Sequence, residues 1–276
     1  SARLRLGLGA IPLAFAAAIL VYPPPLDTRP LAMGGFVPEA VFSQAHDVTE
    51  LAGVEDEKVL FYRDGLSATV SVHRYRGETA LHINGKADAS SRVDMPTQVL
   101  LAQTPLLFGT PAKKVLVVGW ASGVTVGSVL RHPVERLDAV ELEPAMLEAS
   151  HFFDELNGKP LDDPRVRVIV DDARSYLANT RERYDVIISE PSNPWLSGVA
   201  NLFTREHFQK AREALAPGGR LLQWLPLYAT DPDVLRAILA ALRSEFPYVY
   251  GFVLDRAVPD LMLLATTEPL DPSDVP

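Results

Sequence analysis

The chain has 276 residues, of which 47% are hydrophobic, so it is long enough to bury a sizeable core in one large or two modest domains. Its formal net charge is −9 and no run of Lys or Arg is longer than two, which argues against nucleic acid as a partner. The absence of cysteine excludes disulfides, zinc–thiolate sites and a thiol nucleophile. The six histidines include no pair four residues apart, so no metal site is predicted.

The N-terminal stretch is strongly apolar. Residues 6–21 carry no charge and end before three prolines, although they fall just short of the ~17–25 residues that span a bilayer. Because the chain begins with Ser1 rather than Met, residues 1–24 are interpreted as the end of a transmembrane region. A signal or anchor segment and a buried helix of a soluble domain remain alternatives.

Two further segments precede the main pattern of the chain. Residues 25–57 are polar and Pro-rich and are predicted to be a connector. In residues 58–85, apolar and polar residues alternate, and the sequences RDG and RGE, which suit hairpin turns, interrupt the alternation. This pattern predicts two or three antiparallel strands. A helix entered at Pro96 follows, so residues 58–110 are predicted to form a small β domain with a linking helix.

From residue 111 to residue 276 the chain alternates between apolar strands and helices. The strand patterns are KVLVVGW, RLDAVELEP, VRVIVDD, YDVIISEPS, GRLLQWLPL, YVYGFVL and DLMLLAT. Helical patterns separate the first six, among them PAMLEASHFFDEL at residues 144–156. The alternation predicts a doubly wound α/β fold with a mostly parallel, seven-stranded sheet, and its last two strands are too close in sequence to pair other than as a hairpin.

Ligand-binding signals follow successive strands of this predicted sheet, at the edge where such folds bind ligands. After the first strand, the GWASG loop combines Gly119 and Gly123 with the small residues Ala121 and Ser122. Each of the next three strand ends carries an acidic residue, in order Glu141, Asp172 and Glu190. Glu141 lies at the spacing typical of an acid that accepts hydrogen bonds from ribose hydroxyls. A merely solvated Glu141, or Asp172 acting only as a helix cap, remains an alternative.

The motifs VLVVG, VELEPAMLEAS, VRVIVDDARSYL, RYDVIISEPSNPW and NLFTREHFQKAREALAPGGRLLQW resemble the spermidine synthase (polyamine aminopropyltransferase) family. This family is a branch of the Rossmann-like class I methyltransferase fold, and the resemblance runs from about residue 60 to residue 266. The GKADASSRVDMPTQ and SEPSNPW sequences look like its membrane-fused branch. That resemblance implies a location at the inner or plasma membrane, with the synthase-like domain on the cytoplasmic side.

The resemblance also implies functional residues. A donor site for S-adenosylmethionine or its decarboxylated form would comprise Gly119, Ala121, Ser122, Gly123, Glu141, Leu142, Asp172, Ala173 and Glu190. Glu190 would be the catalytic base, although it stands where the family has aspartate. A site for a small amine or similar nucleophile would comprise Lys86, Asp88, Asp94, Asn193, Gln223 and Tyr228. Several of these depart from the family pattern: Asn193 replaces a second acid, and Thr97 and Gln98 replace a Tyr-His pair.

The function expected from these residues is alkylation of an amine, as in aminopropyl transfer, without a metal. Lys86 offers a partner for the carboxylate of intact S-adenosylmethionine, unless it is only a solvated turn residue. Alternatives are a non-catalytic adenosyl- or polyamine-sensing domain of a membrane transporter-like protein, a methyltransferase, and a sulfonium lyase or cyclase. The resemblance leaves the formation of a homodimer open.

Overall fold

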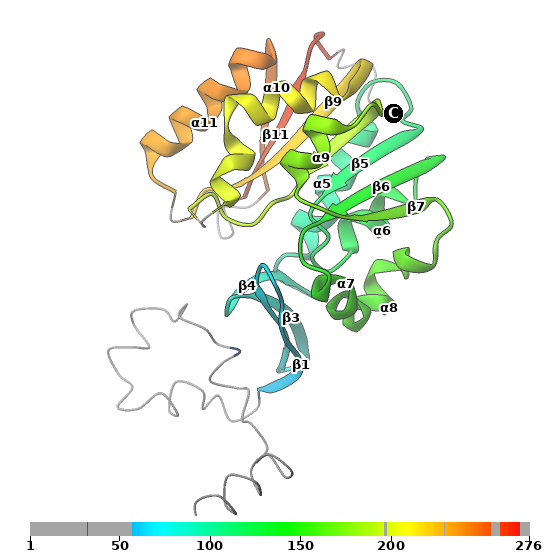
Figure 1. The fold of residues 1–276 in the computed structure, drawn as a ribbon, viewed down its shortest axis with the longest axis vertical. Helices are drawn as coiled ribbons and strands as arrows, with labels where there is room; N and C mark the ends of the chain where they lie inside the picture. Colours follow the sequence, from blue (N-terminus) through cyan, green and yellow to red (C-terminus); the bar gives the residue numbers. More distant parts are fainter. Residues whose placement is uncertain (1–31, 33–56, 196–197, 229, 255–259, 271–276) are drawn as a thin grey trace, which may run out of the picture.

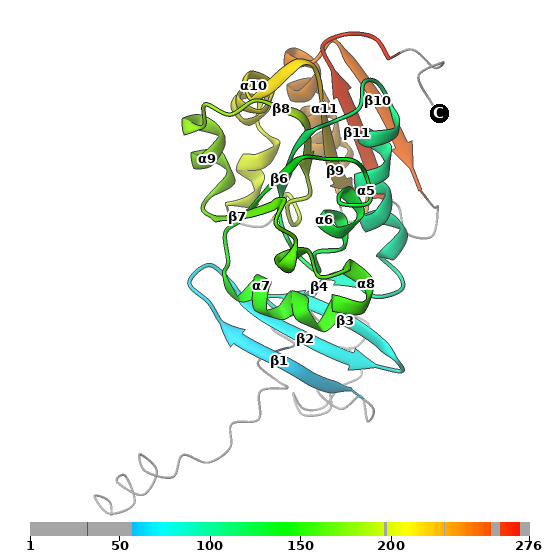
Figure 2. The same cartoon turned by 90° about the vertical axis from the view of Figure 1, so that its right-hand side faces the viewer.

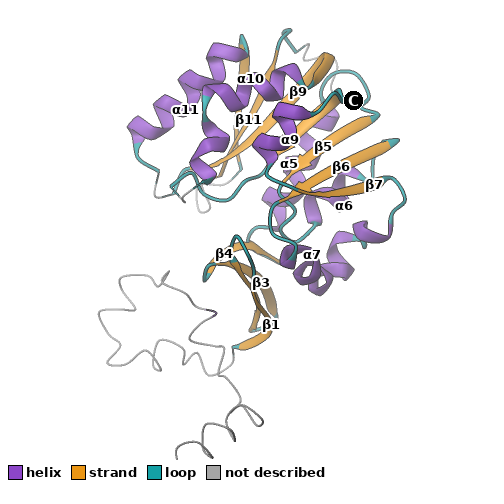
Figure 3. Cartoon of the chain, in the orientation of Figure 1, coloured by secondary structure: helices purple, strands orange, loops and turns teal. Residues whose placement is uncertain are grey.

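The computed structural model describes residue 32 and residues 57–195, 198–228, 230–254 and 260–270 (Figure 1). They form a small antiparallel sheet and a larger mixed sheet covered by helices on both faces (Figure 3). Residues 6–21, which carry the apolar segment, lie outside the described part of the chain.

The small sheet contains one strand more than the sequence pattern predicted. Its strands pair antiparallel in the order β1 (Lys58–Asp64), β2 (Thr69–Tyr75), β3 (Glu78–Ile83) and β4 (Lys86–Ser90). The extra strand arises because Asn84 and Gly85 both have positive φ, of 52° and 80°. Two such residues form the tight turn whose twist matches a β-hairpin, so the chain reverses there and continues as β4.

Helix α5 (Met95–Leu107) links the small sheet to the large one and begins beside Pro96, as predicted. Its C-terminal end is held by Arg220 of the large sheet, whose buried guanidinium donates to the carbonyls of Pro105 and Thr110. Because the last carbonyls of a helix lack partners within the helix, this side chain satisfies groups that burial would otherwise leave unpaired.

The large sheet has the predicted seven strands in the order β10-β11-β9-β8-β5-β6-β7. In chain order they are β5 (Lys114–Val118), β6 (Arg136–Glu141), β7 (Val166–Val170), β8 (Tyr184–Ser189), β9 (Leu215–Pro226), β10 (Tyr248–Val253) and β11 (Asp260–Thr266). The central strands pair in parallel, whereas β11 is antiparallel to both β9 and β10, which confirms the predicted hairpin. The strand order reverses between β5 and β8, and the ends of these two strands are therefore the expected ligand site.

Helices pack on both faces of this sheet. They are α6 (Val124–Val129), α7 (Ala145–Ser150), α8 (Asp154–Asn157), α9 (Ala173–Asn179), α10 (Arg205–Glu213) and α11 (Pro232–Glu245), with short 3-10 helices η1 (His151–Phe153), η2 (Pro160–Asp162) and η3 (Val199–Phe203). Alternate residues of β5 enter two cores: Val115 and Val117 pack with α5 and α6, and Leu116 and Val118 with α9, α10 and α11. A strand buried on both faces explains why KVLVV is continuously apolar.

The predicted helix over residues 144–156 is broken into α7, η1 and α8. Phe153, at the junction, has a non-helical backbone and is buried in the core. The Asn157 amide donates to the Ser150 carbonyl at 3.2 Å and to the Ser122 carbonyl at 2.9 Å. The segment therefore bends inward, and α7 and α8 lie across the small sheet (Figure 2). The periodicity of the sequence could not show this bend because its cause is a contact with a distant loop.

The expectation of a membrane location is corrected by the structure. Across the described residues, no helix combines the length and the apolar character needed to cross a bilayer.

Candidate active site

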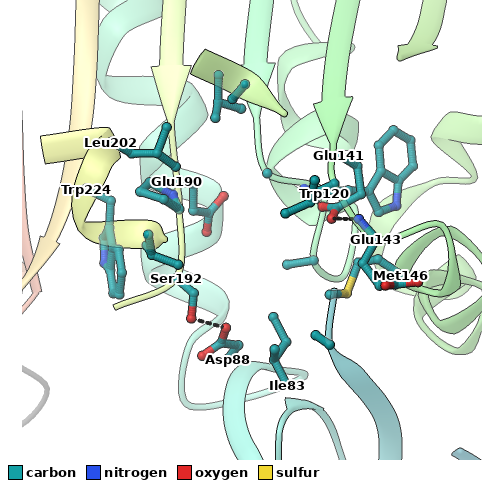
Figure 4. Close-up of a pocket in the computed structure, with 18 of the residues that line it drawn as sticks. Ile83, Asp88, Trp120, Glu141, Glu143, Met146, Glu190, Ser192, Leu202 and Trp224 are labelled. Carbon is teal, nitrogen blue, oxygen red and sulfur yellow. Dashed lines mark hydrogen bonds between the residues drawn. The ribbon is translucent and has the colours of Figure 1, made fainter. Parts of the chain in front are cut away.

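A cavity of about 330 Å³ opens between the carboxyl edge of the large sheet and the small sheet (Figure 4). The ends of β5, β6, β7 and β8 form one wall, and β4 with the β1–β2 turn forms another. Figure 4 places Glu141, Glu143 and Met146 on one side of it and Glu190, Ser192 and Trp224 on the other. The cavity thus has two halves, one beside Glu141 and one beside Glu190.

The loop after β5 brings backbone atoms close to the cavity. Gly119 has φ of +93°, and a side chain there would overlap the backbone carbonyl of Glu190. Only glycine fits both constraints, so this residue lets the first and fourth strand ends approach each other. Ala121 also adopts a positive φ, of 45°, which is uncommon for residues other than glycine. Gly119 and Ala121 both line the cavity.

Glu141 is buried, which excludes the alternative of a solvated side chain. Its Oε2 accepts the backbone N–H of Trp120 at 2.9 Å and its Oε1 accepts the backbone N–H of Glu143 at 2.8 Å. Burial raises the pKa of the Glu141 carboxyl, while these N–H donors favour the ionised form. Each oxygen keeps a further lone pair, so the carboxylate can hold the glycine loop and still accept hydrogen bonds from a ligand.

Asp172 serves as a helix cap and lines the cavity at the same time. Its Oδ1 accepts the backbone N–H of Ser175 at 2.9 Å, which caps α9. It lies beside Ala173 and near Leu142, whose side chain is half exposed, and all three contribute to the cavity wall. The cap interpretation is therefore correct, and it does not compete with a place in the ligand site.

Glu190 lies in the other half of the cavity, directly after β8. Burial, together with the nearby carboxylates Asp260, Asp94 and Asp88, raises its pKa to about 8. The Thr125 hydroxyl lies 2.7 Å from Glu190 Oε2 and stabilises the charged form. A carboxyl group with a pKa near neutrality can both accept and return a proton under physiological conditions.

Lys86 is not a turn residue, as the sequence interpretation had placed it, but the first residue of β4. It is buried, and its ammonium donates to Asp88 Oδ1 at 2.7 Å and to the Ala87 carbonyl at 2.9 Å. The ammonium also lies 5.8 Å from the centre of the Tyr228 ring. The solvated interpretation of Lys86 is therefore wrong, because the side chain is held inside the cavity by an ion pair.

Four predicted residues lie behind the cavity wall rather than on it. They are Ser122, Gly123, Asn193 and Gln223. Ser122 donates to the Gln98 side chain, and Gly123 is the N-cap residue that precedes α6. Asn193 donates to the Tyr228 hydroxyl at 3.4 Å, and Gln223 donates to the Trp224 carbonyl at 2.9 Å. These four residues do not line the cavity, as the resemblance had implied they would, and the three that have polar side chains donate hydrogen bonds within the protein instead.

The sequence interpretation also missed residues that line the cavity. Glu143 accepts the backbone N–H of Ser67 at 3.0 Å and so docks the β1–β2 turn, and Met146 lies beside it. The available signal was that Glu143 and Met146 closely follow Glu141, in ELEPAM. Trp224 and Asp260 come from β9 and the start of β11, and no local pattern pointed to them.

Comparison with known proteins agrees with this architecture. The family model for the spermine/spermidine synthase domain matches residues 95–259. The chain is 27% identical to spermidine synthase from Dictyostelium discoideum, over 71% of this chain and 69% of that protein. It is 28% identical to polyamine aminopropyltransferase from Mycobacterium tuberculosis, over 72% of this chain but only 39% of that protein.

A crystal structure of spermidine synthase in complex with the transition-state analogue AdoDATO has the same fold, with a TM-score of 0.72 and 20% sequence identity, covering 79% of this chain and 77% of that chain. The family match covers more than half of the chain. The chain therefore belongs to the spermine/spermidine synthase family, on the Rossmann-like class I methyltransferase fold. The comparisons do not show the membrane-fused branch.

Proposed function

We propose that this chain is an aminopropyltransferase that uses decarboxylated S-adenosylmethionine to alkylate a small amine. The observation that carries the proposal is Glu190, a buried carboxyl group with a pKa near neutrality, which shares one cavity with Glu141. Family membership and the names of the relatives support the same reaction. In this proposal Glu141 and Asp172 hold the nucleoside, and Glu190 serves the amine.

The donor proposed here is the decarboxylated form. Among the described residues that line the cavity, Lys86 is the one cationic side chain, and its charge is already balanced by Asp88 at 2.7 Å. A donor carboxylate would find no free cation there, and it would lie close to the carboxylates of Asp94 and Asp260. Intact S-adenosylmethionine is therefore disfavoured by charge.

The proposed chemistry is a direct displacement at carbon. The lone pair of the acceptor nitrogen forms a bond to the methylene group next to the sulfonium, and the carbon–sulfur bond breaks with its electron pair moving to sulfur. Methylthioadenosine leaves as a neutral thioether, and the surplus proton on the alkylated nitrogen passes to Glu190. The protein contributes by positioning the two reactants and by accepting this proton.

The test is product analysis with the purified chain. We expect the wild-type protein, given decarboxylated S-adenosylmethionine and an amine, to release methylthioadenosine, and to release far less from intact S-adenosylmethionine. Glu190→Gln keeps the shape of the side chain but removes the base, so its turnover should fall at least ~10²-fold. Calorimetry with methylthioadenosine should show binding within a few-fold of wild type, which controls for folding. Unchanged turnover in the variant would exclude Glu190 as the base, and no product from either donor would refute the proposed function.

A further inference from the structure

The ammonium group of Lys86 lies in a cation site formed by the protein itself. It donates to Asp88 Oδ1 at 2.7 Å and to the Ala87 carbonyl at 2.9 Å, and it lies 5.8 Å from the centre of the Tyr228 ring. A carboxylate, a carbonyl oxygen and an aromatic face are the groups with which proteins hold the ammonium of a ligand. The lysine therefore occupies a place that is built to hold an ammonium ion.

Stability does not account for this ion pair. The side chains of Lys86 and Asp88 are only 10% and 9% exposed, so both charges have lost most of their water. The free energy of removing two charges from water offsets much of their attraction, and a buried pair therefore adds little net stability. Asp88 Oδ2 is also held without the lysine, because it accepts the Ser192 hydroxyl at 2.6 Å (Figure 4). A role toward the ligand explains why the lysine lies inside the cavity.

The charge of Lys86 acts on the half of the cavity that contains Glu190. Burial raises the pKa values of Asp94 and Asp260, and the Lys86 charge opposes this rise at both carboxyl groups. Its partner Asp88 is one of the carboxylates that raise the pKa of Glu190. A ligand cation that extends from Glu190 toward Asp88 therefore meets a like charge in its path.

We propose that Lys86 is a specificity-determining residue, whose ammonium fills a cation site that a longer acceptor would otherwise use. This inference rests on the proposed function and goes further, because it restricts the acceptor class to amines that end before Lys86. An acceptor with an additional ammonium at its far end would have to displace Lys86 or lie against its charge. Such a repulsive element is one of the ways in which a site rejects a competing ligand. Without the lysine, Asp88 and Tyr228 would form a vacant cation site.

The experiment compares putrescine, an unbranched diamine, with spermidine, a linear triamine, using decarboxylated S-adenosylmethionine. We expect wild type to prefer putrescine. In Lys86→Ala, the ratio of kcat/KM for spermidine to that for putrescine should rise at least about tenfold, mainly through a lower KM for spermidine, because a like charge is removed and Asp88 is left free. Calorimetry in the presence of methylthioadenosine should show tighter binding of spermidine to Lys86→Ala than to wild type.

Three further variants separate charge from space and from folding. Replacing Asp88 by Asn in the Lys86→Ala protein removes the carboxylate of the vacant site, so the gain toward spermidine should disappear. Lys86→Gln can still donate a hydrogen bond to Asp88 but carries no charge, and it should change the ratio in the same direction if Lys86→Ala is too unstable to purify. Lys113→Ala removes an exposed lysine that pairs with Glu135 at 2.8 Å outside the cavity, so it should behave as wild type.

The outcomes separate this inference from the proposed function. Binding of methylthioadenosine within a few-fold of wild type shows that a variant is folded. An unchanged ratio in Lys86→Ala and Lys86→Gln would overturn the inference and leave the proposed function standing. A gain that persists without the Asp88 carboxylate would also overturn it, because added space alone would then admit spermidine. If wild type consumes no amine, the proposed function has failed. Equal affinity of wild type and Lys86→Ala for spermidine would then reject the inference as well.

Discussion

At the scale of single residues, the Thr125 hydroxyl lies between Glu190, the proposed base, and the Gln98 carbonyl. It lies 2.7 Å from Glu190 Oε2 and 3.1 Å from the Gln98 carbonyl, but it carries one proton and can donate to only one of them. When Glu190 is protonated, its own O–H can donate to Thr125, and the Thr125 proton is then free for the carbonyl. When Glu190 is ionised, Thr125 must turn to it and leave the carbonyl.

We therefore predict that Thr125→Val moves the pH dependence of catalysis. The Thr125 hydroxyl favours ionised Glu190, so its removal raises the Glu190 pKa above about 8. A base acts in its ionised form, so kcat/KM for the acceptor should rise with pH through this pKa, and its midpoint should lie at higher pH in the variant. Asp88, Asp94 and Asp260, which also face Glu190, are the same in both proteins.

The measurement is a series of kcat/KM values between pH 6 and pH 10 for wild type, Thr125→Val and Thr125→Ser. Because serine keeps the hydroxyl, Thr125→Ser should return the midpoint toward the wild-type value. An identical midpoint in all three proteins would show that Glu190 is not the group that titrates.

At the scale of elements, α6 and α8 approach so closely that no side chain fits between them. A side chain at Gly127, in the middle of α6, would overlap the backbone carbonyl of Asn157 at the end of α8. This contact matters for the site because the Asn157 side chain also donates to the Ser122 carbonyl, within the loop after β5. The spacing of the two helices is thus coupled to the shape of the half of the cavity beside Glu141.

We predict that Gly127→Ala lowers the free energy of unfolding by about 1–3 kcal/mol, despite the better helix propensity of alanine, because the added methyl group overpacks the contact. Methylthioadenosine should also bind more weakly. Urea denaturation and calorimetry measure the two effects. Ser128→Ala, the next residue of the same helix, is the matched control and should change neither quantity appreciably. A Gly127→Ala protein as stable as wild type would show that the helices can separate without loss.

The elements show which features a sequence can reveal. Glu141, Asp172 and Glu190 were identified because each lies at or just after the end of an apolar strand, and the topology brings such strand ends together. Asp260 was missed because its partner Thr97 is 163 residues away and no local pattern joins them. The Asn84-Gly85 pair is typical of a hairpin turn, but strand β4 after it was missed because it has only five residues. Local sequence patterns therefore predict the helices, the strands and the residues at strand ends. Hydrogen bonds between polar side chains far apart in the sequence depend on the tertiary fold, so the sequence does not show which side chains are available to a ligand.

At the scale of the whole molecule, the cavity belongs to neither sheet alone. The small sheet is tied to the large one by two polar contacts at the cavity rim, Ser67 to Glu143 at 3.0 Å and Asp88 to Ser192 at 2.6 Å. Gly65 packs so closely on the Glu143 carboxylate that a side chain there would overlap it. Residues from both sides of this junction line the cavity, so a ligand that fills it would contact both sides.

The docking of the β1–β2 turn on Glu143 has a consequence for amide hydrogen exchange. A molecule that occupies the cavity stabilises the state in which the two sheets are joined, so openings that separate them become rarer. We predict that saturating methylthioadenosine slows deuterium uptake in residues 63–70, although most of these do not touch the ligand, and leaves uptake in α11, far from the junction, unchanged. Mass spectrometry of peptic fragments measures both regions in one experiment. Equal uptake with and without the ligand in residues 63–70 would mean that the small sheet opens independently of the cavity it helps to enclose.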